Sequence, residues 1–316
     1  MSPPVSDDEV APERAPRVVA LDVGGTVLKG GVYEVDDTAV GVHRVTPLRR
    51  ATPVSAGPEA VVTAALAALA ELCALAPDAR AVGLVVPGVV DEAAGIAVES
   101  ENLLWRDVPF AELAAARTGR AVAFGHDVRA GGRAELAALA GAAPRDALVV
   151  LVGTGIAALM VVAGQVVEGM YAGEIGHAPV GPEEPCACGS TGCLETISSA
   201  AAIARRYRAG GGPQVPGARE VLQAAEAGDP VAGRVWSEAV TGLVKALAAY
   251  TTLLAPEVIV VGGGLSLAGP ALLDPLTTGL ERRLTFQPMP RLRVGVLGDE
   301  AGSVGAALLA RDLLSR

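Results

Sequence analysis

The stretch RVVALDVGGTVLKGGVYEV, residues 17–35, decides the fold class. It begins as a β-branched apolar run, breaks at Gly24-Gly25 and continues with strand character, which predicts two strands joined by a tight turn. A related pattern returns in ALVVLVGTGIAALMVVAG (147–164), again with glycines and a threonine at the break. Helical and strand segments follow each stretch. The sequence therefore predicts an α/β protein built from two βββαβα-like halves.

The remaining segments have recognisable helical or strand patterns. In the first half we expect a third strand at 39–47, further strands at 80–88 and 120–127, and helices at 57–76, 109–119 and 128–139. In the second half we expect a short strand at 165–169, helices near 198–208 and 231–254, a strand at 257–264, a helix at 270–284, a strand at 291–297 and a helix at 303–314. Residues 1–16 are rich in proline and acidic groups and lack the pattern of a signal peptide, so we expect a disordered tail there.

Composition excludes several classes of protein. The 316 residues suggest two domains, and 51% hydrophobic residues rule out a disordered chain. A net charge of -10 disfavours nucleic acid and anionic lipid as partners. Residues 147–167 carry no charge and are long enough to cross a bilayer, but the Gly153-Thr154-Gly155 break favours a buried hairpin. We expect a cytoplasmic protein.

Three of the four cysteines lie within eight residues, at Cys186, Cys188 and Cys193. With His177 they supply three thiolates and one imidazole, which is the ligand set of a closed tetrahedral zinc site. Such a site leaves no open position for a catalytic water, so the zinc is predicted to be structural. The alternative is a chance cluster of thiols.

Glycine-rich turns form a second group of candidates. Glycine lets the backbone approach a ligand, and exposed amides in such turns suit phosphate oxygens. Asp22, before the first turn, could hold Mg²⁺ through water. Ordinary hairpin turns are the alternative for both Gly-Thr turns, and the run Gly262-Gly263-Gly264 is weak by itself. The sequence contains neither a P-loop motif nor a dinucleotide-binding glycine motif after a strand.

Asp127 stands where a predicted strand ends and a helix begins. Active residues often occupy that place in α/β proteins, but an aspartate there is also an ordinary helix N-cap, and local sequence favours the cap. Arg129 and Arg133 either help to keep the carboxylate ionised or are simply solvated. His43, Cys73, Trp105 and Trp236 are interpreted as structural.

Together these motifs resemble the ROK family of sugar kinases and regulators, within the actin and hexokinase ATPase superfamily. The family's motifs occur in its order as LDVGGT (21–26), GHD (125–127), GTGIA (153–157), GEIGH (173–177), CACGSTGCLE (186–195) and GGGLS (262–266). The segment NLLWRDVPF (102–110) is most similar to that of the family's bacterial glucokinases. The resemblance implies a two-lobed, actin/hexokinase-like (ribonuclease H-like) fold, in which each lobe is a mixed sheet flanked by helices. The implied lobes are residues 17–125 plus 303–316 and residues 126–302, the second with a zinc-binding loop at 177–193.

The resemblance also implies roles for matching positions. Asp127 would be the general base on the sugar hydroxyl. The implied sugar-binding residues are Asn102, His126, Glu174, His177 and Glu195. The implied nucleotide- and Mg²⁺-binding residues are Asp22, Gly24, Gly25, Thr26, Gly153, Thr154, Gly155, Gly262, Gly263 and Gly264. His126 departs from the family, which usually has asparagine there, and Lys29 stands two positions beyond the usual lysine.

These residues lead to the expectation of an ATP-dependent hexose kinase, acting on the 6-hydroxyl of glucose, with Mg²⁺ and a structural zinc ion. Family members commonly form dimers, so a homodimer is expected. The alternatives are a kinase for fructose, N-acetylmannosamine or N-acetylglucosamine, the use of polyphosphate as donor, and a non-catalytic sugar-responsive regulator. Only about sixteen residues precede the first strand, which is too few for the DNA-binding domain of such a regulator.

Overall fold

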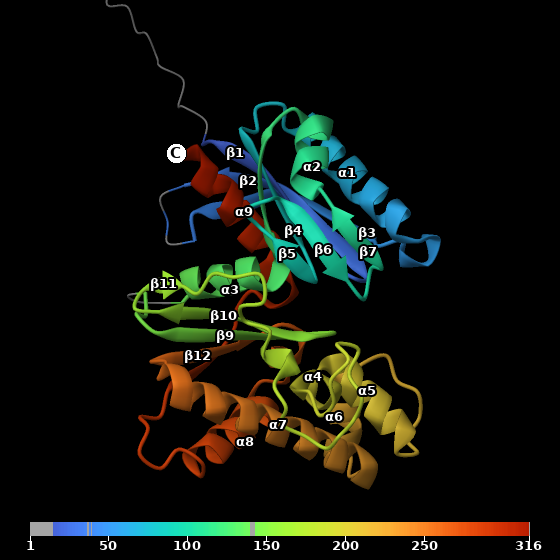
Figure 1. Cartoon of the computed structure of the whole chain (residues 1–316), viewed down its shortest axis with the longest axis vertical. Coiled ribbons are helices and arrows are strands. Elements are labelled where there is room, and N and C mark those ends of the chain that lie inside the picture. Colours follow the sequence, from blue (N-terminus) through green and yellow to red (C-terminus); the bar gives the residue numbers. More distant parts are fainter. Residues whose placement is uncertain (1–14, 37, 39, 140–142, 316) are drawn as a thin grey trace, which may run out of the picture.

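The computed structural model describes residues 15–36, 38, 40–139 and 143–315, and two five-stranded sheets form its framework (Figure 1). The first sheet has the spatial order β3 (Val42–Ala51), β2 (Val27–Val35), β1 (Arg17–Val23), β4 (Ala81–Val86) and β8 (Ala121–His126). β1, β2 and β3 pair antiparallel, whereas β1, β4 and β8 are parallel. The sheet is therefore mixed, and its parallel strands end at one common edge.

The second sheet repeats this arrangement. Its order is β11 (Gln165–Val166), β10 (Ile156–Val162), β9 (Ala147–Val152), β12 (Val258–Gly262) and β13 (Arg291–Val294). β9, β10 and β11 pair antiparallel, and β9, β12 and β13 are parallel. Both βββαβα halves and the buried hairpin at 147–167 are confirmed. The final predicted strand ends at Val294, three residues early.

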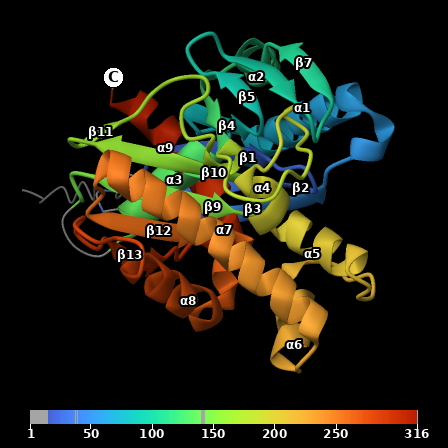
Figure 2. The same cartoon turned by 60° about the horizontal axis from the view of Figure 1, so that its bottom comes forward.

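Helices cover both faces of the sheets. The first sheet lies between α1 (Pro58–Leu75), α2 (Phe110–Thr118) and, on the other side, α9 (Ala301–Leu314). The second lies between α3 (Asp127–Ala137) and the group α4 (Leu194–Ser198), α5 (Ala200–Ala209), α6 (Ala218–Glu226), α7 (Pro230–Leu254) and α8 (Pro270–Glu281). Figure 2 shows α7 crossing the second sheet beside α8. The architecture is that predicted, mixed sheets flanked by helices.

Helix α1 is the one helix in the described part of the chain that is long and apolar enough to cross a membrane. It begins with Pro58 at its first turn, where the missing N–H is not needed. Its residues Val61, Leu69 and Leu72 are buried in the core cluster that includes Leu21 of β1. This packing places one face of α1 against the core of the first sheet.

Helices α3 and α9 pack closely between the two sheets. A Cβ atom added to Gly305 would lie 2.2 Å from the backbone carbon of Ala130, so the two backbones touch. α3 also contacts β9 and β10, while α9 contacts β1 and β4. The helix pair thus joins the two sheets and places the N-terminus of α3 between them.

A small three-stranded sheet was not expected. It consists of β5 (Val89–Asp91), β6 (Ile96–Ser100) and β7 (Trp105–Val108), paired antiparallel. Trp105 is buried and meets Phe110 edge to face, with ring centroids 5.1 Å apart. Helix α6 was also missed. Strands β5, β6 and β7 are too short for their hydrophobic periodicity to be recognised in the sequence. They are stabilised by packing against the first half of the chain.

Candidate active site

Asp22 lies near the end of β1 and is buried, with 9% of its surface exposed. Within the described residues its Oδ1 has no hydrogen-bond partner, and a Cβ atom on Gly302 would come within 2.4 Å of its Oδ2. Burial, and then the charge of Asp127, raise the pKa of Asp22 to about 8, while Lys29 opposes the shift. A buried carboxylate with a free oxygen fits a hydrated divalent cation, so the residues present suit Mg²⁺.

The turn after Asp22 is held by hydrogen bonds from Thr52, which lies just after β3. The Thr52 hydroxyl donates to the carbonyl of Gly24 at 2.7 Å, and the Thr52 amide donates to that of Thr26 at 2.9 Å. Gly25 and Thr26 are exposed, and a Cβ on Gly25 would lie 3.9 Å from Cβ of Asn102. The predicted phosphate turn and the predicted sugar residue Asn102 are therefore neighbours.

The N-terminus of α3 carries His126 and Asp127. His126 Nδ1 accepts from the amides of Val128 and Arg129 at 3.1 and 3.4 Å, so the imidazole is the helix cap. The local interpretation of Asp127 as the cap was wrong, because it is the first residue inside the helix. Its Oδ1 accepts from the Val128 amide at 2.7 Å and lies 3.3 Å from His126 Nδ1.

Glu174 lies between two imidazole rings. Its Oε1 is 4.0 Å from His126 Nε2, and its Oε2 is 3.9 Å from His177 Nε2. Burial raises the pKa of Glu174, while His126 and His177 act in the opposite direction. Because Nδ1 of His126 accepts backbone hydrogen bonds, its Nε2 carries the proton and is a donor. His126, Glu174 and His177 thus form a row, in which His126 Nε2 is a donor and the Glu174 carboxylate an acceptor for a hydroxyl-rich ligand.

The predicted metal ligands His177, Cys186, Cys188 and Cys193 come together, with one candidate ligand atom from each within 4.8 Å of all the others. Cys186 Sγ lies 3.7 Å from His177 Nδ1, and Cys188 Sγ lies 3.7 Å from Cys193 Sγ. Zinc–sulfur bonds of about 2.3 Å in a tetrahedron separate sulfurs by about 3.8 Å. Burial and then the neighbouring thiols raise the pKa of Cys193 to about 12. Three sulfurs and one imidazole nitrogen at these separations match the ligand set and spacing of a tetrahedral zinc site, so this set fits zinc.

Glu195 connects the metal loop to the second Gly-Thr turn. It belongs to α4, which begins directly after Cys193, and its Oε2 accepts from the Ile156 amide at 2.7 Å. A Cβ on Gly155 would come within 2.6 Å of the same oxygen. One carboxylate oxygen of this predicted sugar residue is therefore used to hold the Gly153-Thr154-Gly155 turn.

The third glycine turn follows β12. Gly263 has φ +76°, and a Cβ there would lie 2.6 Å from the Val152 carbonyl oxygen. Only glycine tolerates this approach, which sets the turn beside the end of β9 and hence beside Gly153. Gly262 also lies against Glu135, a fully buried carboxylate of α3 that accepts from the amides of Val296 and Leu297.

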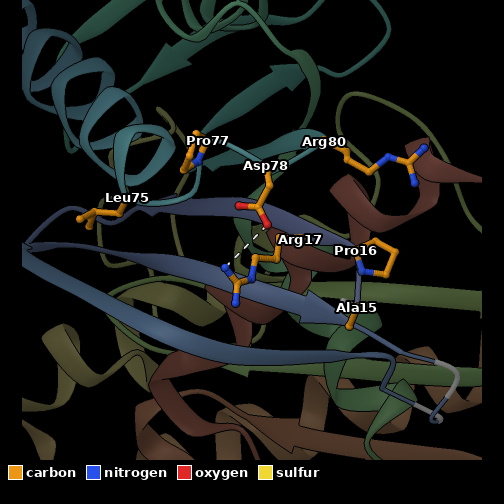
Figure 3. Close-up of a pocket in the computed structure, with 7 residues that line it drawn as sticks. All are labelled: Ala15, Pro16, Arg17, Leu75, Pro77, Asp78 and Arg80. Atoms are coloured by element: carbon orange, nitrogen blue, oxygen red, sulfur yellow. Dashed lines mark ion pairs between the residues drawn. The ribbon is translucent and has the colours of Figure 1, made fainter. Parts of the chain in front are cut away.

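A pocket of about 880 Å³ lies elsewhere, at the opposite end of β1 (Figure 3). Arg17 lines it, and its guanidinium lies 2.8 Å from Glu34 and 3.7 Å from Asp78. Asp22 is five residues along the strand, about 17 Å away. This hollow is separate from the residues that the sequence singled out.

A model described as the ROK family matches residues 18–313. The chain belongs to the ROK family. The match runs from β1 into α9 and therefore includes both sheets and every candidate site residue named above. The predicted family is confirmed.

Relatives within the ROK family include sugar kinases. Glucokinase of Thermotoga maritima is 30% identical over 94% of this chain and 98% of that protein. N-acetylmannosamine kinase of Citrobacter koseri is 30% identical over 93% of this chain and 98% of its own length. The crystal structure of a ROK family glucokinase from Streptomyces griseus in complex with glucose and AMPPNP has a TM-score of 0.81 at 29% identity, covering 94% and 99% of the two chains. These relatives fit a hexose kinase.

Sequence reasoning missed Glu92 and Glu135. Glu92 has no motif, and only the fold shows that its carboxylate reaches His126 and Arg129. Of the two arginines considered, Arg129 is buried against Glu92, and Arg133 pairs with Asp312 at 2.7 Å. Neither is simply solvated. The interpretation of Cys73, Trp105 and Trp236 as packing residues is confirmed by their burial.

Proposed function

We propose that this ROK protein is an ATP-dependent hexose kinase that phosphorylates the 6-hydroxyl of glucose, with Asp127 as general base. The observation that supports the proposal is the place of Asp127 at the start of α3: its carboxylate lies 3.3 Å from His126, the first member of the His126–Glu174–His177 row, and its charge acts on buried Asp22. Asp22 suits a cation and phosphates, and the row suits hydroxyls. Asp127, between them, would accept the proton as the sugar oxygen attacks the terminal phosphate.

The sugar would be bound by Asn102, His126, Glu174, His177 and Glu195. A desolvated hydroxyl needs a partner, and these side chains offer both donors and acceptors. Glu195 has one oxygen for the sugar, since the other holds Ile156. Glu195 would thus contact the sugar with one oxygen and the phosphate turn at Gly155 with the other, and so connect the two sites.

The triphosphate would lie along the backbone amides of the turns at 24–26 and 153–155, with adenosine against Gly262-Gly263-Gly264. Mg²⁺ bound near Asp22 would neutralise charge on the phosphates. Asp22 must be ionised to hold a cation well; the nearby charge of Lys29 favours the ionised form, while burial and Asp127 oppose it. The turns supply donors that need no rearrangement during transfer.

Zinc held by His177, Cys186, Cys188 and Cys193 would have a structural role. Four protein ligands leave no position for a reacting water. Its effect would be to fix the backbone between His177 and Glu195, and thereby the Nε2 of His177 toward the sugar. We further propose two lobes, residues 17–125 with 303–316 and residues 126–302, that close on the substrates and exclude water. We also propose that the protein is cytoplasmic and forms a homodimer.

The test is the Asp127→Asn variant assayed for ADP release with glucose, ATP and Mg²⁺. Loss of the base should lower kcat by about 10²–10⁴-fold, while zinc content stays at the wild-type value and the unfolding midpoint does not fall. Asp274→Asn, at an exposed position on α8, is the matched control and should keep full activity. Wild-type turnover in the Asp127 variant would refute the assignment.

The other candidates are separated by substrate panels. A panel of glucose, fructose, N-acetylmannosamine and N-acetylglucosamine decides the sugar, and His126 is the reason to include all four, because an imidazole donates where an amide both donates and accepts. Polyphosphate in place of ATP tests the donor. A sugar-dependent gel shift at physiological salt, with no phosphorylation of any hexose, would instead support a regulator.

A further inference from the structure

Arg129 is a buried cation that the proposed reaction does not use. It lies in the first turn of α3 with 8% of its surface exposed. Its Nε and Nη2 both lie 2.9 Å from Oε1 of Glu92, in the turn after β5. The Glu92 side chain is itself 45% exposed, so the pair joins a buried guanidinium to a carboxylate at the protein surface.

The Glu92 oxygen has a third donor. The backbone amide of His126 donates to the same Oε1 at 3.0 Å. His126 is the cap of α3 and precedes Asp127, so Glu92 holds the backbone of both residues from the first half of the chain. A Cβ on Gly125 would lie 3.5 Å from this oxygen, which shows how closely the turn after β5 approaches the end of β8.

The other side of the guanidinium faces the second half. Nη1 of Arg129 donates to the carbonyl of Gly169 at 3.5 Å, and the same carbonyl accepts from the Ala172 amide at 3.1 Å. This loop ends at Gly173 and Glu174. A Cβ on Gly173 would lie 1.9 Å from the Ala158 carbonyl oxygen, so the far end of the loop is held by β10. Arg129 holds its near end.

We propose that Glu92 and Arg129 are a positioning pair for the sugar site: one guanidinium joins the turn after β5, the start of α3 and the loop that carries Glu174. This inference rests on the proposed function. Arginine suits the task because its planar fork places donors on two sides, toward Glu92 and toward Gly169. Lysine has a single charged nitrogen and cannot serve both. Loss of the pair should misplace Asp127 and Glu174 relative to each other.

The test compares Glu92→Ala, Glu92→Gln and Arg129→Lys with the control Arg133→Gln. Arg133 lies one turn further along α3 and pairs with Asp312 at 2.7 Å, so its loss also removes an ion pair from this helix. Glu92→Ala and Arg129→Lys should each raise the sugar KM and lower kcat by about tenfold, with the ATP KM within about twofold of wild type. Glu92→Gln should retain most activity, since its amide oxygen still accepts from His126 and Arg129.

Amide hydrogen exchange gives a second readout that does not depend on turnover. Exchange in the segment 167–174 should become faster in Glu92→Ala and Arg129→Lys and stay at the wild-type rate in Arg133→Gln. Variants that change only the unfolding midpoint, or that raise both KM values equally, would overturn the positioning role. An inactive wild type would overturn the proposed function, and exchange would then decide whether the pair holds the loop.

Discussion

Replacing Asp22 with asparagine should make the nucleotide-free protein more stable, and increasingly so as pH rises. The ordinary pKa of 3.8 is raised to about 8 in the folded protein, chiefly by burial and then by Asp127. The folded protein therefore keeps a proton that the unfolded chain has lost. The stabilisation from that proton is complete below about pH 4 and is lost as pH rises toward the folded pKa of about 8.

The magnitude follows from the width of this window. Each pH unit between the two pKa values costs the wild type about 1.4 kcal/mol, so about 3 kcal/mol is lost between about pH 5 and pH 7. D22N has no such proton to lose. The asparagine side chain has the same shape as aspartate and fits the same space beside Gly302. The difference in free energy of unfolding between D22N and wild type should grow by about 3 kcal/mol over that range.

Urea unfolding at about pH 5, 6 and 7, without nucleotide or added Mg²⁺, measures this difference. All other groups titrate in both proteins, so the difference isolates Asp22 and its coupling to Asp127. D274N, at an exposed site, should follow the wild type at every pH. A D22N advantage that is constant, or that shrinks as pH rises, would refute the reasoning. D22N should also lose ATP turnover, as expected for a carboxylate kept for function at the expense of stability.

Three further predictions test the metal, the packing and a buried carboxylate. Cys186→Ser should reduce zinc from close to one ion per chain and lower the unfolding midpoint in calorimetry; a metal-free variant as stable as wild type would contradict this. Gly83→Ala places a Cβ 1.8 Å from the Ala306 carbonyl oxygen and should cost about 3 kcal/mol in urea unfolding, whereas Gly233→Ala, with no atom within 4 Å, should cost nothing. Glu135→Ala leaves two amides of the loop after β13 without an acceptor and should cost about 3 kcal/mol by the same assay.

Most of the fold could be predicted from local sequence patterns. The strand at 17–23, the hairpin at 147–162 and the long helix ending at Leu254 are all present, because apolar periodicity and glycine breaks act over a few residues. The metal cluster was also predictable, since its three cysteines are close in the chain. The small sheet β5–β7 was missed because its short strands owe their order to Trp105 and Phe110 packing against distant residues.

The sequence by itself determined the two mixed α/β halves, the glycine turns and the cluster of one histidine and three cysteines, since each depends on residues that are close together in the chain. Tertiary structure alone decided that Glu92 accepts from the His126 amide, that Asp22 is buried beside Gly302, and that Glu92 meets Arg129. Those contacts join segments that are far apart in sequence. Their energies depend on burial and on distances between atoms, and no local pattern records either.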